Sequence, residues 1–170
     1  TQLIVGSSDV YKRQIMAIIS ALLLILVYIT VRFELKYAVG AIAALSHDVL
    51  VTLGIFSLFG YEISLAVIAA FLTIVGYSLN DTIVIFDRVR ENAALLKKSK
   101  LTSVINQSVN DSLSRTIVTS LTTFFVVLIL FIFGGEVLHT FSFAMIIGVL
   151  VGTYSSIFVA SPVVIYMDKN

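Results

Sequence analysis

The sequence predicts an all-α fold, a polytopic membrane helix bundle with five transmembrane helices. Three observations predict it. Hydrophobic residues make up 59% of the 170-residue chain and charged residues only 12%, whereas soluble domains carry about 25% charged residues. The apolar residues also lie in long blocks, each close to the ~20 residues that a helix needs to cross a bilayer. The chain contains no cysteine, which excludes disulfides and thiolate metal sites.

The first three spans are expected over residues 15–31, 37–58 and 63–86. The first block is almost uninterrupted and ends where charged side chains begin. The second holds a histidine and an aspartate near its middle, and a short turn over 59–62 separates it from the third. The preceding residues, 1–14, resemble neither a signal peptide nor a domain. We interpret them as an unrelated leader or a boundary stump.

The last two spans are expected over 113–133 and 137–167, with a glycine-rich turn over 134–136 between them. Residues 87–112, between the third and fourth spans, are polar. Apolar residues nevertheless recur in this segment at helical spacing, which indicates an amphipathic helix on the cytoplasmic membrane surface. The apolar residues are Leu101, Val104, Ile105, Val109 and Leu113.

Lysine and arginine residues gather on one side of this arrangement, and that side is therefore predicted to be cytoplasmic. They are Arg32, Lys36, Arg88, Arg90, Lys97, Lys98, Lys100, Arg115 and Lys169. The first span would then run from outside to inside, and the C-terminus would be cytoplasmic. Because a chain that starts with such a span normally has something before it, we interpret the sequence as a C-terminal fragment that lacks at least one earlier helix.

Two charged residues lie in the cytoplasmic halves of neighbouring spans, Asp81 in the third and Arg115 in the fourth. An aspartate at the bilayer centre costs roughly 2.5–3.5 kcal/mol on insertion scales, so Asp81 needs a partner, a wet cavity or a proton. One interpretation is an inert pair that fixes helix register. The other is a proton relay that also includes Asn80. We favour the relay, because burial stabilises the neutral carboxyl and a nearby arginine stabilises the charged form.

His47 and Asp48 lie near the middle of the second span and are candidates for the same proton relay. Histidine titrates near neutral pH, which suits it to this role. A histidine bonded to a helix carbonyl would serve structure instead, and the sequence leaves both possibilities open. His47 and His139 fall on different spans and near different depths, which argues against a metal site.

Small residues form one face of the fifth span. Gly148 and Gly152 make a G-x-x-x-G pattern, and Ser155 and Ser156 continue the same face. Small side chains let helix backbones approach closely, so this face predicts helix packing rather than chemistry. Further along, Pro162 is expected to kink the cytoplasmic end of the span.

Five blocks of the sequence resemble the SecF members of the SecD/SecF family of protein-export membrane proteins. This family belongs to the resistance-nodulation-division (RND) superfamily of proton-driven transporters. The blocks follow the family's order and spacing and cover roughly residues 15–167. They are YITVRF (28–33), GAIAALSHDVLVTLG (40–54), LTIVGYSLNDTIVIFDRVREN (72–92), NDSLSRTIVT (110–119) and GVLVGTYSSIFVASP (148–162).

The resemblance implies six transmembrane helices, a periplasmic domain between the first two, and pseudo-symmetric pairing with SecD. By this likeness, the chain holds the last five helices, which form half of an RND-type transmembrane domain. In the family, the aspartate of the Asn-Asp-Thr motif and the arginine of the Ser-Arg-Thr motif belong to the proton pathway. These two residues correspond to Asp81 and Arg115, and a further acidic residue comes from SecD.

The implied function is proton-driven assistance to protein translocation by the Sec machinery of the bacterial inner membrane. The implied partners are SecD, the Sec translocation channel, the translocating unfolded polypeptide and the lipid bilayer. We expect no enzyme activity, cofactor or nucleic-acid partner. One alternative is a fragment of an RND-type exporter of small molecules or lipids. A remote alternative is an intramembrane aspartyl protease that uses Asp48 and Asp81, although Asp81 lacks the glycine-flanked motif of such enzymes.

Overall fold

A computed structural model describes most of the chain. The described residues are Lys12, Met16, 19–20, 23–25, 27–31, 34–96 and 99–168. Within them, all regular secondary structure is helical, which confirms the predicted all-α class. The predicted leader over 1–14 lies outside the described residues except for Lys12.

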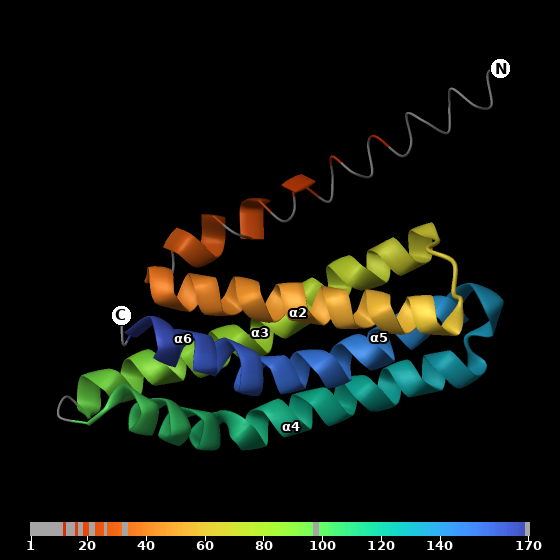
Figure 1. The fold of residues 1–170 in the computed structure, drawn as a ribbon. Helices are drawn as coiled ribbons and strands as arrows, with labels where there is room; N and C mark the ends of the chain where they lie inside the picture. Colours follow the sequence, from red (N-terminus) through yellow and green to blue (C-terminus); the bar gives the residue numbers. More distant parts are fainter. Residues whose placement is uncertain are drawn as a thin grey trace.

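The bundle is built from long helices that alternate in direction (Figure 1). In chain order the elements are α2 (Leu35–Phe59), α3 (Leu65–Leu95), α4 (Leu101–Phe133), α5 (Gly135–Ser155), a π-helical turn η1 (Ser156–Ala160) and α6 (Ser161–Asp168). In Figure 1, α5 and α6 form one nearly continuous rod between α2 and α4. Because α5 packs against α2, α3 and α4, it is the central helix of the bundle.

Four helical segments are long and apolar enough to cross a membrane. They are Leu35–Phe59, Leu65–Leu95, Leu101–Phe133 and Leu138–Asp168. The sequence predicted five such spans. The first of these, over residues 15–31, lies partly outside the described residues and is not among the four. The outer face of α4 is apolar, as contact with hydrocarbon requires; its exposed residues include Ile117, Leu121, Phe125 and Ile129.

The polar segment over 87–112 differs from its prediction, because it does not form a separate surface helix. α3 runs on well past residue 86 and α4 begins well before residue 113. With 31 residues, α3 is about 46 Å long, longer than the roughly 30 Å of a hydrocarbon core. Val104 and Ile105 are buried in the same cluster as Val89 of α3. The helical spacing of apolar residues therefore reflects packing between α3 and α4.

A tight turn makes α2 and α3 antiparallel neighbours. Gly60 ends α2 with a φ of 68°, a left-handed conformation that glycine adopts without steric cost. Its N–H donates to the carbonyl of Ser57 at 3.3 Å. Ser64 then caps α3, because its hydroxyl accepts a hydrogen bond from the N–H of Val67 at 3.4 Å.

The two ends of the bundle differ in chemistry. At one end, called the charged end, Lys36 pairs with Asp168 at 3.0 Å and Arg88 pairs with Asp111 at 3.2 Å. These pairs join α2 to α6 and α3 to α4. The opposite end holds an aromatic cluster, in which the ring of Phe56 contacts those of Tyr61, Phe71 and Phe143. The helices are thus held by polar contacts at one end and by aromatic packing at the other.

Two glycines let α5 approach α3. A Cβ atom placed on Gly148 would collide with the side chain of Ile74, and one placed on Gly152 would lie 3.2 Å from Cβ of Ser78. A side chain at Gly148 would therefore displace Ile74 from its place between the two helices. This close approach brings the α5 residues that follow Gly152 next to polar side chains of α2 and α3.

Candidate functional site

Asp81 is a buried acid on α3. Only 3% of the residue is exposed, and its Oδ2 atom has no hydrogen-bond partner among the described residues. Two nearby hydroxyls are engaged elsewhere, because Thr82 donates to the carbonyl of Ser78 at 3.0 Å and Ser78 donates to Asp48. A buried polar atom without a partner costs about 1–3 kcal/mol. The carboxyl group of Asp81 is therefore open to a proton or a water molecule.

Arg115 on α4 is a charged residue that attracts Asp81. Its guanidinium lies near enough for a Coulomb interaction with the carboxylate. Arg115 is exposed and Asp81 is buried, and no ion pair within 4.0 Å joins these two described residues. The structure thus brings the two predicted relay residues into one region without direct contact. A separation of this kind leaves room for a bridging water.

A cleft of about 380 Å³ opens between α3 and α4 next to Arg115. Its lining is mostly charged and consists of Val84, Asp87, Arg88, Glu91, Asp111, Ser112 and Arg115. Arg88 donates to Asp111 at 3.2 Å and to Glu91 at 2.9 Å. Arg115 therefore faces a polar opening at the charged end of the bundle.

Asp48 on α2 forms a second polar centre, called the Asp48 node (His47, Asp48, Ser78 and Ser155). Asp48 is 1% exposed. Its Oδ2 accepts hydrogen bonds from the hydroxyls of Ser78 at 2.5 Å and Ser155 at 2.8 Å. Its Oδ1 lies 3.1 Å from Nδ1 of His47. One carboxylate thus joins α2, α3 and α5, and unlike Asp81 it has partners on both oxygens.

The ring of His47 pairs with Asp48 rather than with a helix carbonyl. Its side chain is 32% exposed, and its ring centroid lies 6.3 Å from that of Tyr154. Across residues 34–96 and 99–168, no hydrogen bond links this pair to Asp81 or Arg115. The structure therefore places His47 and Asp48 in a network separate from the Asp81–Arg115 region.

Three residues near these acids have different contacts from those that the sequence predicted. Asn80 is exposed, and in the described part of the chain it makes no hydrogen bond to Asp81 or Arg115. Ser155 was assigned to packing because of its size, but its hydroxyl also donates to Asp48. Ser78 was missed altogether. Both serines could have been found from the sequence. A buried acid requires hydrogen-bond donors, and Ser78 and Ser155 carry hydroxyl groups within neighbouring spans.

A chain of hydroxyl groups that the sequence did not predict also joins α3, α4 and α5. Tyr77 on α3 donates to Ser120 on α4 at 3.2 Å. The hydroxyls of Ser120 and Thr153 on α5 lie 2.7 Å apart, and Thr153 donates to the carbonyl of Val149 at 2.7 Å. Ser156 of η1 likewise donates to the carbonyl of Thr153 near the end of α5 at 3.0 Å. These bonds satisfy polar groups that hydrocarbon could not.

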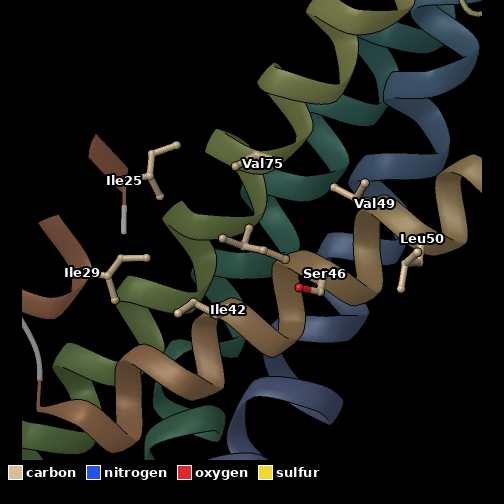
Figure 2. A pocket seen from close by; sticks show the side chains of 8 residues that line it. Ile25, Ile29, Ile42, Ser46, Val49, Leu50 and Val75 are labelled. Carbon is tan, nitrogen blue, oxygen red and sulfur yellow. The ribbon is translucent and has the colours of Figure 1, made fainter. Parts of the chain in front are cut away.

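A larger cavity, of about 450 Å³, has a different character (Figure 2). Its lining is apolar apart from Ser46 and consists of Ile25, Ile29, Ile42, Leu45, Ser46, Val49, Leu50 and Val75. The lining contains no ionisable group, so the cavity could hold an apolar chain but has no side chain that could take up a proton. No three described His, Asp or Glu side chains come together as metal ligands.

The sequence matches a known family over nearly its whole length. The family model described as "Protein export membrane protein SecD/SecF, C-terminal" matches residues 4–170. The chain is 59% identical over 165 residues to the protein translocase subunit SecF of Rhodothermus marinus, and 52% identical over 154 residues to that of Petrotoga mobilis. The matches cover 94% and 91% of this chain but 54% and 51% of the relatives. The chain therefore spans about half the length of the curated relatives it matches.

The fold matches solved structures as well. A crystal structure of SecDF from Thermus thermophilus, described as a translocon-associated membrane protein, matches with a TM-score of 0.88 and 46% identity over 92% of this chain and 22% of that chain. A SecDF structure in a super-membrane-facing form gives a TM-score of 0.86 and 47% identity over 91% of this chain and 21% of that one. With a family match over residues 4–170 and relatives more than half identical to it, this chain belongs to the SecD/SecF family of protein-export membrane proteins.

Proposed function

We propose that this chain is the membrane part of a proton-driven subunit that assists protein translocation, and that Asp81 and Arg115 form its proton relay. The observation that carries the relay is the buried carboxylate of Asp81, whose Oδ2 has no hydrogen-bond partner among the described residues. Arg115 attracts this carboxylate from the neighbouring helix. Family membership favours translocation over the exporter and protease alternatives, because the relatives are named protein translocase subunits.

The relay works through the charge of Asp81. Protonation removes the negative charge that attracts Arg115, and the guanidinium can then turn to another carboxylate, such as Asp111 one turn away on α4. Loss of the proton restores the attraction, so a proton selects between two arrangements of α3 and α4. One proton crossing supplies about 2.3 kcal/mol per 100 mV. This matches the net contribution of a few hydrogen bonds, at about 1 kcal/mol each.

The Asp48 node has a structural role in this proposal. Both oxygens of Asp48 have hydrogen-bond partners within the bundle, unlike those of Asp81. We therefore assign to it the positioning of α3 and α5 around α2. Asp81 and Arg115 then remain as the ionisable pair whose contacts can change at low cost.

The proposed setting is the bacterial inner membrane, with SecD as the partner subunit. The similar solved structures are of SecDF, and this chain would supply one half of the helices around the proton path. The charged end would face the cytoplasm together with the C-terminus, because lysine and arginine concentrate there. The Sec channel and the unfolded polypeptide would be engaged by the complete assembly.

Asp81→Asn tests the relay in the full-length protein assembled with SecD in membrane vesicles. We expect it to abolish the part of protein export that depends on the proton gradient, because an amide cannot release a proton at this position. Thr82→Val is the matched control, since Thr82 is equally buried and the change removes a hydroxyl instead of a charge. Normal proton-dependent export and proton flux in Asp81→Asn would refute the relay.

A further inference from the structure

The apolar cavity of about 450 Å³ lies between three parts of the chain (Figure 2). Ile25 and Ile29 line it from the segment that precedes α2, Val75 lines it from α3, and the other lining residues belong to α2. None of these side chains carries a charge. The volume falls within the roughly 300–1,000 Å³ of small-molecule sites. The cavity is therefore large enough for a ligand, and its walls favour an apolar one.

The cavity is open to the hydrocarbon of the bilayer. Ser46 is exposed and Leu50 is 67% exposed, although both line the cavity. Both also lie within Leu35–Phe59, which is long and apolar enough to cross a membrane. If the cavity were empty, its lining would lack dispersion contacts on one side. Hydrocarbon that enters from the bilayer restores these contacts.

The width of the cavity favours a single flexible chain over a second helix. Its lining on α2 extends from Ile42 to Leu50, which is about 12 Å at the rise of an α-helix. A volume of about 450 Å³ over this length gives a cross-section of roughly 40 Å². An α-helix with its side chains is about 10–12 Å wide and needs roughly 80–110 Å². A helix would therefore insert only side chains, whereas a hydrocarbon chain fits along the whole length.

The depth of the cavity indicates which lipid supplies this chain. Lys36 belongs to the charged end of the bundle, and along α2 Ile42 lies about 9 Å and Leu50 about 21 Å beyond it. The cavity thus extends through the charged-end leaflet to about the middle of a hydrocarbon core roughly 30 Å thick. A phospholipid tail of that leaflet occupies the same range of depths. A second apolar cavity, of about 250 Å³, shares Val49 and Val75 with the first and continues the groove away from the charged end.

We propose that the cavity of Figure 2, called the tail site, binds one acyl chain of a membrane phospholipid from the charged-end leaflet. The bound chain fills the space between α2, α3 and the segment before α2, and so joins them by apolar contacts. The head group stays outside the cavity, at the charged end. Because the tail site shares no lining residue with the charged cleft next to Arg115, it is independent of the proposed relay.

Ser46→Phe tests the tail site in the full-length protein, assembled with SecD and purified from membranes in mild detergent. The new ring enters the cavity without replacing a buried side chain, because Ser46 is exposed. Ser57→Phe is the matched control, since Ser57 is also an exposed serine of α2 and lines neither cavity. Native mass spectrometry counts the phospholipids that stay bound. We expect one retained phospholipid whose occupancy is about tenfold lower in Ser46→Phe than in wild type or Ser57→Phe, because the ring displaces several methylene groups.

Equal occupancy in Ser46→Phe and Ser57→Phe would overturn the tail site. Ser46→Ala makes the lining wholly apolar and should keep the phospholipid, so its loss in this variant would exclude an apolar chain as the ligand.

Photocross-linking in intact membranes identifies the occupant. A photoreactive benzoyl-phenylalanine in place of Leu50 should form an adduct with the mass of a phospholipid, and Ser46→Phe should abolish this adduct. An adduct with SecD or with another segment of the same protein would mean that protein covers the groove, which contradicts the proposal. An adduct with a free fatty acid would exclude a phospholipid as the source of the chain.

Discussion

The hydroxyl of Ser78 donates a hydrogen bond to Oδ2 of Asp48 at 2.5 Å. Ser78 lies three residues before Asp81, so this bond joins α3 to α2 about one helical turn from the proposed proton site. Ser155 reaches the same oxygen from α5 at 2.8 Å. The Asp48 node therefore determines where α3 lies relative to two neighbouring helices, close to the residue on which the relay depends.

Ser78→Ala removes one donor from this buried carboxylate. We expect the free energy of unfolding to fall by about 1.5–3 kcal/mol, the range for hydrogen bonds to charged groups. Equilibrium denaturation of the full-length protein in mild detergent measures this. Thr73→Ala is the control, because it removes a hydroxyl that bonds only to a carbonyl on the exposed side of the same helix, with an expected change within about 0.5 kcal/mol. Equal losses in the two variants would contradict the node.

Asp48→Asn separates a structural role from a role in proton transfer. The amide oxygen still accepts hydrogen bonds from the serines, but these bonds lose their charge assistance. We expect a loss of stability of about 1–2 kcal/mol, while proton-driven export per folded molecule stays within about twofold of wild type. If the variant folded as stably as wild type and lost export, Asp48 would belong to the relay.

Gly148→Ala tests the close approach of α5 to α3. The new methyl group would collide with the side chain of Ile74, so we expect a loss of about 1–3 kcal/mol of stability in thermal or chemical unfolding. Gly54→Ala is the matched control, since its Cβ would meet nothing within 4 Å, and this variant should be neutral or more stable by up to about 1 kcal/mol. Ile74→Ala should partly rescue Gly148→Ala. Indistinguishable stabilities of the two glycine variants would count against this packing.

Arg115→Gln removes the cation that attracts Asp81. Without it, the carboxyl group of Asp81 loses the opposite charge that its exchange of a proton depends on in the proposed relay, so proton flux into proteoliposomes should stop. A pH-sensitive dye inside the vesicles measures the flux. Arg90→Gln, which removes an exposed arginine that pairs with Asp87 at 3.6 Å, should leave the flux intact. Normal flux in Arg115→Gln would leave the pair with a structural role only.

The helical class could be predicted from the sequence, and so could the placement of Asp81 and Arg115 in one region of the bundle. Both predictions follow from charge and apolar periodicity, which are properties of the chain itself. The ends of α3 and α4 could not be predicted in the same way. The length of an apolar block reports only the part of a helix in hydrocarbon, whereas both helices continue beyond it and pair through Val89, Val104 and Ile105.

Contacts between helices were harder to predict, because they depend on how each helix is rotated about its axis. Asn80 was predicted to belong to the same relay as Asp81, yet adjacent residues on a helix point about 100° apart, and Asn80 is exposed. Ser78 lies three residues before Asp81, and both are buried on the same side of α3. Ser155 was predicted to serve helix packing from its size alone. Its hydrogen bond to Asp48 depends on the close approach of α5 at Gly152.

Infrared difference spectroscopy of the full-length protein, recorded between acidic and alkaline pH, tests the relay most directly, because it observes the protonated carboxyl group itself. Asp81 is neutral at the acidic end and charged at the alkaline end of its titration. We predict a carboxylic C=O band that grows on acidification, is absent from Asp81→Asn and persists in Asp48→Asn. Identical difference spectra from the wild type and Asp81→Asn would contradict the claim that Asp81 takes up and releases a proton.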